Sequence, residues 1–124
     1  MAPKLSPVSV AVIVKDRKKA VRWYREKLGM DVLDQHEHWV TVGSKKGGLR
    51  LHLCQTTEYD PKGKLEPGNT GILLRVPGDL EKAYRELKRK GVKFTHPPEK
   101  MPWGWLCLLT DPDENEFSLM PARA

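Results

Sequence analysis

The pattern of apolar and polar positions in residues 8–55 predicts one strand, one helix and three further strands. Residues 8–14 are rich in β-branched side chains, which favour a strand. Over residues 17–28 the apolar positions form one helical stripe, and Asp16 and Gly29 are typical of a helix start and end. The three strand-like segments that follow are residues 31–35, 39–43 and 49–55. The predicted order is βαβββ.

The second half of the chain repeats this order. Residues 71–76 predict a strand, and residues 80–90 predict a helix that begins after Asp79 and ends at Gly91. The last three predicted strands are residues 92–95, 105–110 and 116–120. The cap and the closing glycine are separated by 13 residues in the first half (29 − 16) and 12 in the second (91 − 79). This agreement indicates an internal duplication.

The duplication defines the expected organisation of the chain. A length of 124 residues fits one domain of ordinary size, so we expect a single domain over residues 1–124. Within it, we place the first module at about residues 8–55 and the second at about residues 70–120. Residues 56–69 are polar and contain two prolines and two glycines, which is typical of a linker.

Composition narrows the classes of partner. The chain has 22 Lys and Arg against 16 Asp and Glu, a net charge of +6 and a pI near 9.4. The positive residues alternate with glutamates at helical spacing, which is typical of solvated helix faces, and no aromatic ladder accompanies them. We therefore expect no nucleic-acid partner.

The longest apolar run, Val10–Val14, has five residues, whereas a membrane span needs about 20. The first residues also lack the pattern of a secretory signal. Cys54 and Cys107 are far apart in apolar segments, which favours reduced, buried thiols. We expect a cytoplasmic protein with no membrane partner.

Motifs near both ends of the chain carry a family resemblance. They are Val14-Lys15-Asp16, Ala20, Trp23-Tyr24, Leu28-Gly29, Pro102-Trp103-Gly104 and Asp111-Pro112-Asp113-Glu114-Asn115. With these motifs, residues 8–120 resemble the vicinal oxygen chelate superfamily, which includes glyoxalase I, bleomycin resistance proteins and extradiol dioxygenases. The resemblance implies an α+β fold, in which two βαβββ modules of curled mixed sheets surround a ligand-holding cup, and a homodimer. Glu114 stands where the family usually has glycine, so left-handed backbone there would cost stability.

Side chains alternate between the two faces of each predicted strand. The set expected to face the helix and the core is Val8, Val10, Val12, Val14, Leu49, Leu51, Leu53, Ile72, Leu74, Val76, Phe117 and Leu119. The set expected to line the cup is Ser9, Ala11, Ile13, Arg50, His52, Cys54, Gly71, Leu73, Arg75, Glu116, Ser118 and Met120.

The resemblance also implies where a metal would bind. Metal-dependent members hold a divalent ion at four positions, which fall here at Ser9, His52, Gly71 and Ser118. Only His52 is a suitable donor, although stable binding needs about three protein ligands. We therefore expect no metal and no cofactor.

Other candidate chemistry is weak. His36, His38 and His96 are best interpreted as surface residues, because no third ligand lies near the His36-Glu37-His38 pair. The sequence contains no recognisable Ser/His/Asp arrangement, phosphate-binding glycine loop or zinc-ligand spacing. If a reaction proceeds without a metal, His52 and Glu116 are the candidate acid and base.

Arginine and tryptophan residues mark the candidate ligand site. If Arg50 and Arg75 lie about 8 Å apart, their repulsion is about 2 kcal/mol at an effective dielectric near 20. Either an ion pair with Glu116 or an anionic ligand would offset it. Three tryptophans provide wide apolar surfaces, although core packing is equally compatible with each of them. The expected ligand-binding residues are Trp39, Arg50, His52, Arg75, Trp103, Trp105, Glu116 and Ser118.

The sequence thus favours a metal-free protein that binds an anionic or aromatic small molecule. The alternative is a metal-dependent lyase, isomerase or dioxygenase of the glyoxalase kind. A third hypothesis is a regulatory or scaffold protein that has no pocket.

Overall fold

The structure of the chain is a computed structural model, which describes residues 3–36, 39–55 and 67–122. The chain divides into two compact units, Met1–Leu65 and Glu66–Ala124. The boundary between the units falls inside the segment that the sequence indicates as a linker.

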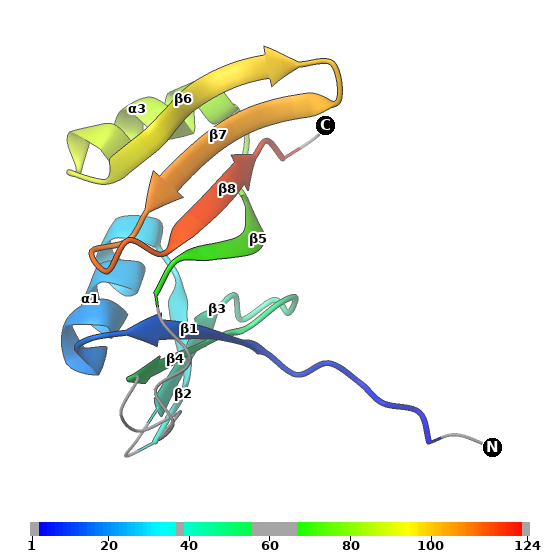
Figure 1. Cartoon of the computed structure of the whole chain (residues 1–124), viewed down its shortest axis with the longest axis vertical. Helices are drawn as coiled ribbons and strands as arrows, with labels where there is room; N and C mark the ends of the chain where they lie inside the picture. The colour runs from blue at the N-terminus through cyan, green and yellow to red at the C-terminus, as the bar shows by residue number, and fades with distance from the viewer. Residues whose placement is uncertain (1–2, 37–38, 56–66, 123–124) are drawn as a thin grey trace. The chain divides into compact units, whose positions relative to one another are not determined.

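Within its described residues, unit 1 contains a four-stranded sheet and one helix (Figure 1). Its elements are β1 (Val10–Val14), α1 (Arg17–Leu28), β2 (Asp31–Gln35), β3 (Trp39–Gly43) and β4 (Leu51–Gln55). The strand order is β1-β4-β3-β2, with β1 parallel to β4 and the other neighbours antiparallel. Helix α1 packs on β2, β3 and β4. The predicted βαβββ order is confirmed for this unit.

Unit 2 has the same order of elements. They are β5 (Asn69–Arg75), α3 (Leu80–Arg89), β6 (Lys93–Met101), β7 (Gly104–Thr110) and β8 (Glu116–Met120). The strand order is β5-β8-β7-β6, with β5 parallel to β8 (Figure 1). The two mixed sheets, each with one helix among the residues that the structure describes, confirm the predicted α+β fold class.

Both helices begin where their capping residues predict, and α1 also ends as predicted. The Asp16 carboxylate accepts a hydrogen bond from the backbone N–H of Lys19 at 3.1 Å, and Gly29 ends α1 in the left-handed conformation, with φ of 66°. Asp79 caps α3 in the same way through the N–H of Lys82, at 3.3 Å. Helix α3 ends at Arg89, one residue earlier than predicted.

The predicted core needs five corrections in unit 1. Val10, the first residue of β1, is 36% exposed. Val8 and Leu49 are 78% and 51% exposed, because β1 and β4 begin only at Val10 and Leu51. Conversely, Ile13 and Cys54, which were expected to line a cup, are 5% and 2% exposed. These two residues are register partners, and Val12 and Val14 on the opposite face are buried as well. This end of the β1–β4 pair is therefore buried on both faces.

Strand β6 is longer than the sequence indicates. It runs to Met101 rather than ending at Thr95, and its register against β7 shifts twice. Pro97 and Pro98 fit there because β6 is an edge strand, where a missing N–H leaves no sheet partner unpaired. His96, expected in a loop, lies in this strand, and its Nε2 is 2.8 Å from the Glu99 carboxylate.

The turn before β8 contains strained backbone at the position that the sequence indicates. Glu114 has φ of 64°, the one positive φ among the described residues that are not glycine. Left-handed backbone costs an L-residue about 1–2 kcal/mol. Glycine avoids this cost, although the greater flexibility of its unfolded chain offsets part of the gain.

We therefore expect Glu114→Gly to stabilise the protein by about 1 kcal/mol. Urea denaturation measures this difference, and Glu114→Ala is the matched control because alanine keeps the strain. Equal stability of the two variants would contradict a strained turn.

Candidate functional site

In unit 1, one polar row crosses the sheet on the face opposite α1. Register pairs His52 with Ala11 on β1 and with Thr41 on β3, and pairs Thr41 with Asp34 on β2. Paired residues share a face of the sheet, so these side chains gather on one surface. We call this surface the His52 face and define it as Ser9, Ala11, Asp34, Thr41, Arg50 and His52.

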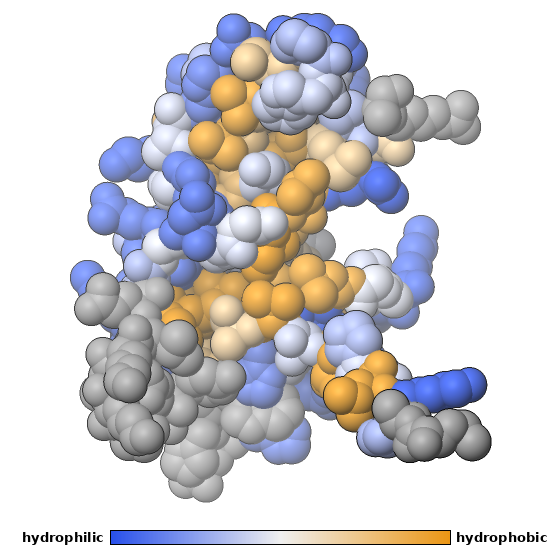
Figure 2. All heavy atoms as spheres, turned by 45° about the vertical axis from the view of Figure 1, so that its right-hand side comes forward, coloured by the Kyte–Doolittle hydropathy of each residue, from blue (hydrophilic) through white to orange (hydrophobic). Residues whose placement is uncertain are grey.

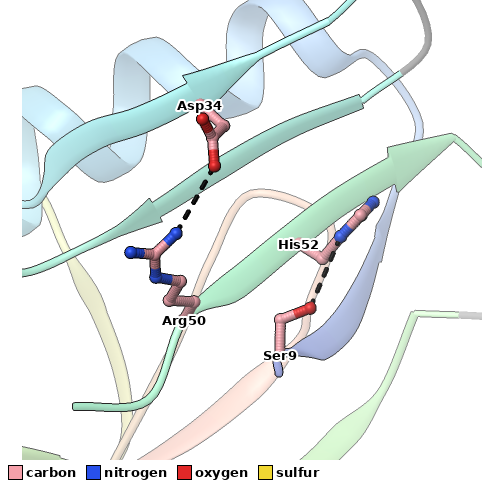
Figure 3. Close-up of polar contacts among 4 residues, drawn as sticks. All are labelled: Ser9, Asp34, Arg50 and His52. Carbon is pink, nitrogen blue, oxygen red and sulfur yellow. Dashed lines mark hydrogen bonds and ion pairs between the residues drawn. The ribbon is translucent and has the colours of Figure 1, made fainter. Parts of the chain in front are cut away.

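Two polar contacts organise the His52 face (Figure 3). Ser9 Oγ lies 3.5 Å from His52 Nδ1, and Arg50 Nη1 lies 3.4 Å from Asp34 Oδ2. The Arg50 and Asp34 side chains are 48% and 52% exposed, so solvent screens the ion pair and it contributes little to stability. Its main effect is to hold the guanidinium in place.

His52 is electrostatically tuned. Partial burial, and then the charge of His36, hold the pKa of His52 below its ordinary value of 6.5. The unfolded chain therefore binds a proton at His52 before the folded chain does. Titration of His52 therefore does not reduce the free energy of unfolding above pH 6.5. Below that pH it lowers the free energy of unfolding progressively, until the pH reaches the pKa of His52 in the folded chain. At neutral pH the imidazole is uncharged and able to accept a proton.

In unit 2, the corresponding face lies on β5, β7 and β8. Ser118 is paired with Leu73 on one side and with Leu108 on the other, while Arg75 is paired with Met120. Leu73 is 60% exposed. We call this surface the Ser118 face and define it as Leu73, Arg75, Leu108, Thr110, Glu116, Ser118 and Met120. Apolar side chains among hydrophilic ones are visible on the molecular surface in Figure 2.

Glu116 and Arg75 do not pair with each other on the Ser118 face. The Glu116 carboxylate accepts a hydrogen bond from Thr95 Oγ1 at 2.9 Å. Arg75 is exposed and has no hydrogen-bond or ion-pair partner among the described residues of its unit. Of the two possibilities left open by the sequence, an ion pair within unit 2 is therefore not formed.

Trp103 and Trp105 occupy different environments. Trp103 is 68% exposed in the turn between β6 and β7. Alternation along β7 places Trp105 with buried Cys107 and Leu109, on the face opposite Leu108 and Ser118. Trp105 is thus separate from the Ser118 face, and Lys100 Nζ lies 5.3 Å from its ring centroid. Trp39 begins β3, and its side chain lies outside the described part of the structure.

The donors at the four implied metal positions do not suit a divalent ion. Ser9 and His52 are in contact, yet together they provide one imidazole and one hydroxyl. Gly71 has no side chain and sits in a register shift of β5 with φ of 69°. Across residues 3–36, 39–55 and 67–122, no group of three or more His, Cys, Asp or Glu side chains is placed to hold a metal ion.

Sequence reasoning missed the contacts that shape both faces. It named Arg50 and His52 without Asp34, and Glu116 without Thr95. Asp34 and Thr95 both lie at register shifts, in β2 and β6, where simple alternation fails. Sequence reasoning also assigned Ser9 and His52 to the same face of the sheet, but it did not predict that Ser9 Oγ contacts His52 Nδ1.

The fold agrees with comparisons to known proteins. The profile of the Glyoxalase/Bleomycin resistance protein/Dioxygenase superfamily matches residues 6–119, and the chain belongs to this superfamily. A superfamily member from Sphaerobacter thermophilus DSM 20745 is 35% identical, with a TM-score of 0.82 over 94% of this chain and 98% of that one. The uncharacterised protein YetH of Bacillus subtilis (strain 168) is 31% identical over 90% of this chain and 93% of its own length.

Two further structures differ in what they support. TnmS3, described as an antibiotic binding protein from Streptomyces sp. CB03234, is 29% identical, with a TM-score of 0.77 over 97% of this chain and 98% of that one. Lactoylglutathione lyase from Agrobacterium tumefaciens has a TM-score of 0.74 over 98% of this chain and 96% of that one, but only 15% identity. The second similarity concerns the fold alone.

Among the described helices, none has the length and apolar character of a membrane span.

Proposed function

We propose that this superfamily member binds a small molecule without the help of a metal ion. The observation that carries the proposal is the donor set: the four implied ligand positions contain one imidazole and one position with no side chain. One imidazole is well below the three or so protein ligands that a divalent ion requires.

The charge of Arg75 on the Ser118 face favours an anionic ligand. Arg75 has no acidic partner within the described residues of unit 2, and Leu73, two positions earlier on the same face, offers exposed apolar surface. An arginine binds a carboxylate in a bidentate way, through two parallel hydrogen bonds. An exposed apolar side chain favours contact with a planar aromatic group. An aromatic carboxylate satisfies both requirements.

Several of the expected residues keep a role in this proposal. On the Ser118 face of unit 2 the proposed binding residues are Arg75, Ser118 and Glu116, and exposed Trp103 of the same unit provides a stacking surface. Arg50 and His52 remain candidates on the His52 face of unit 1. Trp39 remains a candidate, whereas Trp105 is left out because it lies on the other face of its sheet. We further propose a cytoplasmic homodimer, in keeping with the family resemblance and with two free, buried cysteines.

The similarity to TnmS3 supports sequestration of an antibiotic or metabolite rather than catalysis on it, since TnmS3 is described as an antibiotic binding protein. A metal-dependent lyase, isomerase or dioxygenase is the alternative. The 15% identity to lactoylglutathione lyase gives that alternative only the shared fold.

The charge argument predicts a clear binding preference. In a tryptophan-quenching titration, we expect 9-anthracenecarboxylate to bind more tightly than 9-anthracenemethanol, which has the same rings without the charge. Arg75→Ala should weaken binding of the carboxylate by about 1 kcal/mol or more, roughly fivefold or more in Kd, and leave binding of the alcohol unchanged. Arg85→Ala, an exposed arginine on α3, is the matched control. Equal affinity for both probes, or no effect of Arg75→Ala, would contradict the proposal of an anionic ligand.

A further inference from the structure

Ser9 and His52 meet on the His52 face, and the binding proposal does not use Ser9. Strands β1 and β4 are parallel, with Val10 opposite Leu51 and Ala11 opposite His52. The backbone N–H of Val10 donates to the carbonyl oxygen of Arg50 at 3.0 Å, which fixes the start of β1 against β4. Ser9, directly before β1, is thereby held beside His52 (Figure 3).

Ser9 and His52 form a pair of the kind that generates a nucleophile. Ser9 Oγ lies 3.5 Å from His52 Nδ1, at the long end of hydrogen-bond range. In the absence of substrate such contacts are often long and tighten when substrate binds. Both side chains are partly exposed, so a small substrate can reach the hydroxyl. An uncharged imidazole, as His52 has at neutral pH, is the form that accepts a proton.

Arg50 adds positive charge to the His52 face. It lies two residues before His52, directly before the first residue of β4, and contacts Asp34 on the His52 face. Its contact with Asp34 uses Nη1, and the guanidinium has five N–H donors in all. A fixed donor of this kind stabilises the negative oxygen that develops when a nucleophile attacks a carbonyl.

We propose that Ser9, His52 and Arg50 form an acyl-transfer site that accepts carboxylic esters. Ser9 is the nucleophile, His52 is the general base, and Arg50 stabilises the oxyanion. This activity goes beyond the binding function and stands on different residues from the Ser118 face.

The reaction needs only the ester and water. Ser9 Oγ forms a bond to the acyl carbon while its proton moves to His52 Nδ1, and the oxyanion faces Arg50. The bond from the acyl carbon to the leaving oxygen then breaks, and that oxygen takes the proton from His52. Water, deprotonated by His52, next attacks the acyl-serine, and the Ser9 hydroxyl is restored. The products are one acid and one alcohol.

The test uses p-nitrophenyl acetate with the full-length protein at neutral pH. We expect a burst of p-nitrophenol and an acetyl group on Ser9 in peptide mass spectrometry. Ser9→Ala should remove both the burst and that adduct, while Ser6→Ala, another exposed serine of the N-terminal segment, should behave like the unchanged protein. His52→Gln should slow acylation about a hundredfold.

The remaining outcomes also decide the question. Arg50→Ala should slow acylation without moving the adduct from Ser9. Acetyl groups found only on lysines or on His52, or the same burst in the unchanged protein and Ser9→Ala, would overturn the acyl-transfer site. Binding of 9-anthracenecarboxylate, measured on the same samples, reports the binding function separately, so failure of one proposal is distinguishable from failure of the other.

Discussion

Replacing Tyr24 with alanine should destabilise unit 1 by about 4 kcal/mol. Tyr24 is completely buried and is the largest buried side chain that α1 contributes to its unit. Removing a large aromatic side chain from a packed core forfeits both its transfer free energy and the contacts around the resulting cavity. The edge-to-face contact with Trp23, at 5.1 Å between ring centroids, is lost as well.

Urea denaturation and amide hydrogen exchange of α1 would measure this loss. Arg25→Ala, on the exposed side of the same helix, is the matched control and should change stability by no more than about 0.5 kcal/mol. Comparable stabilities of the two variants would mean that α1 does not pack through Tyr24.

The second large effect is expected for Asn115→Ala, at about 3 kcal/mol. Asp111 and Asn115 are 4% and 2% exposed, and they tie the turn before β8 together. The Asp111 carboxylate accepts hydrogen bonds from the backbone N–H groups of Asp113 and Asn115 and from Asn115 Nδ2, at 2.8–2.9 Å. Asn115 Oδ1 in turn accepts the N–H of Gly68 at 2.9 Å.

Alanine at position 115 leaves two buried groups without this partner, the Gly68 N–H and one Asp111 oxygen. Each such loss costs about 1–3 kcal/mol, which sets the expected total. Glu114→Gly in the same turn is the internal control, because it should shift the urea midpoint in the opposite direction. If Asn115→Ala costs less than about 1 kcal/mol, the buried network does not hold the turn.

Most of the fold follows from local chemistry in the sequence. Asp16 and Asp79 cap the helices through their own carboxylates, and Gly29 ends α1 by adopting left-handed backbone, so the helix limits depend on single residues. Strands β2, β3 and β8 likewise have the predicted bounds. Even the strain at Glu114 was predictable, since the position requires a conformation that only glycine adopts freely.

The candidate site was less predictable because it depends on register. Alternation assigns faces correctly only while a strand stays regular, and β2, β5 and β6 each contain register shifts. The sequence therefore gave no way to find Asp34 beside Arg50, or Thr95 beside Glu116. Trp105 illustrates the same limit, because its face is defined by the pairing of Leu108 with Ser118.

The central claim is that the protein binds its ligand without a metal ion, and metal removal tests it most directly. Protein purified without chelators is analysed for bound nickel, zinc, manganese and iron, and 9-anthracenecarboxylate is then titrated before and after treatment with EDTA. We predict metal contents well below one ion per chain and the same affinity in both titrations. One tightly bound divalent ion per chain, with ligand binding lost after EDTA and restored by that ion, would contradict the account.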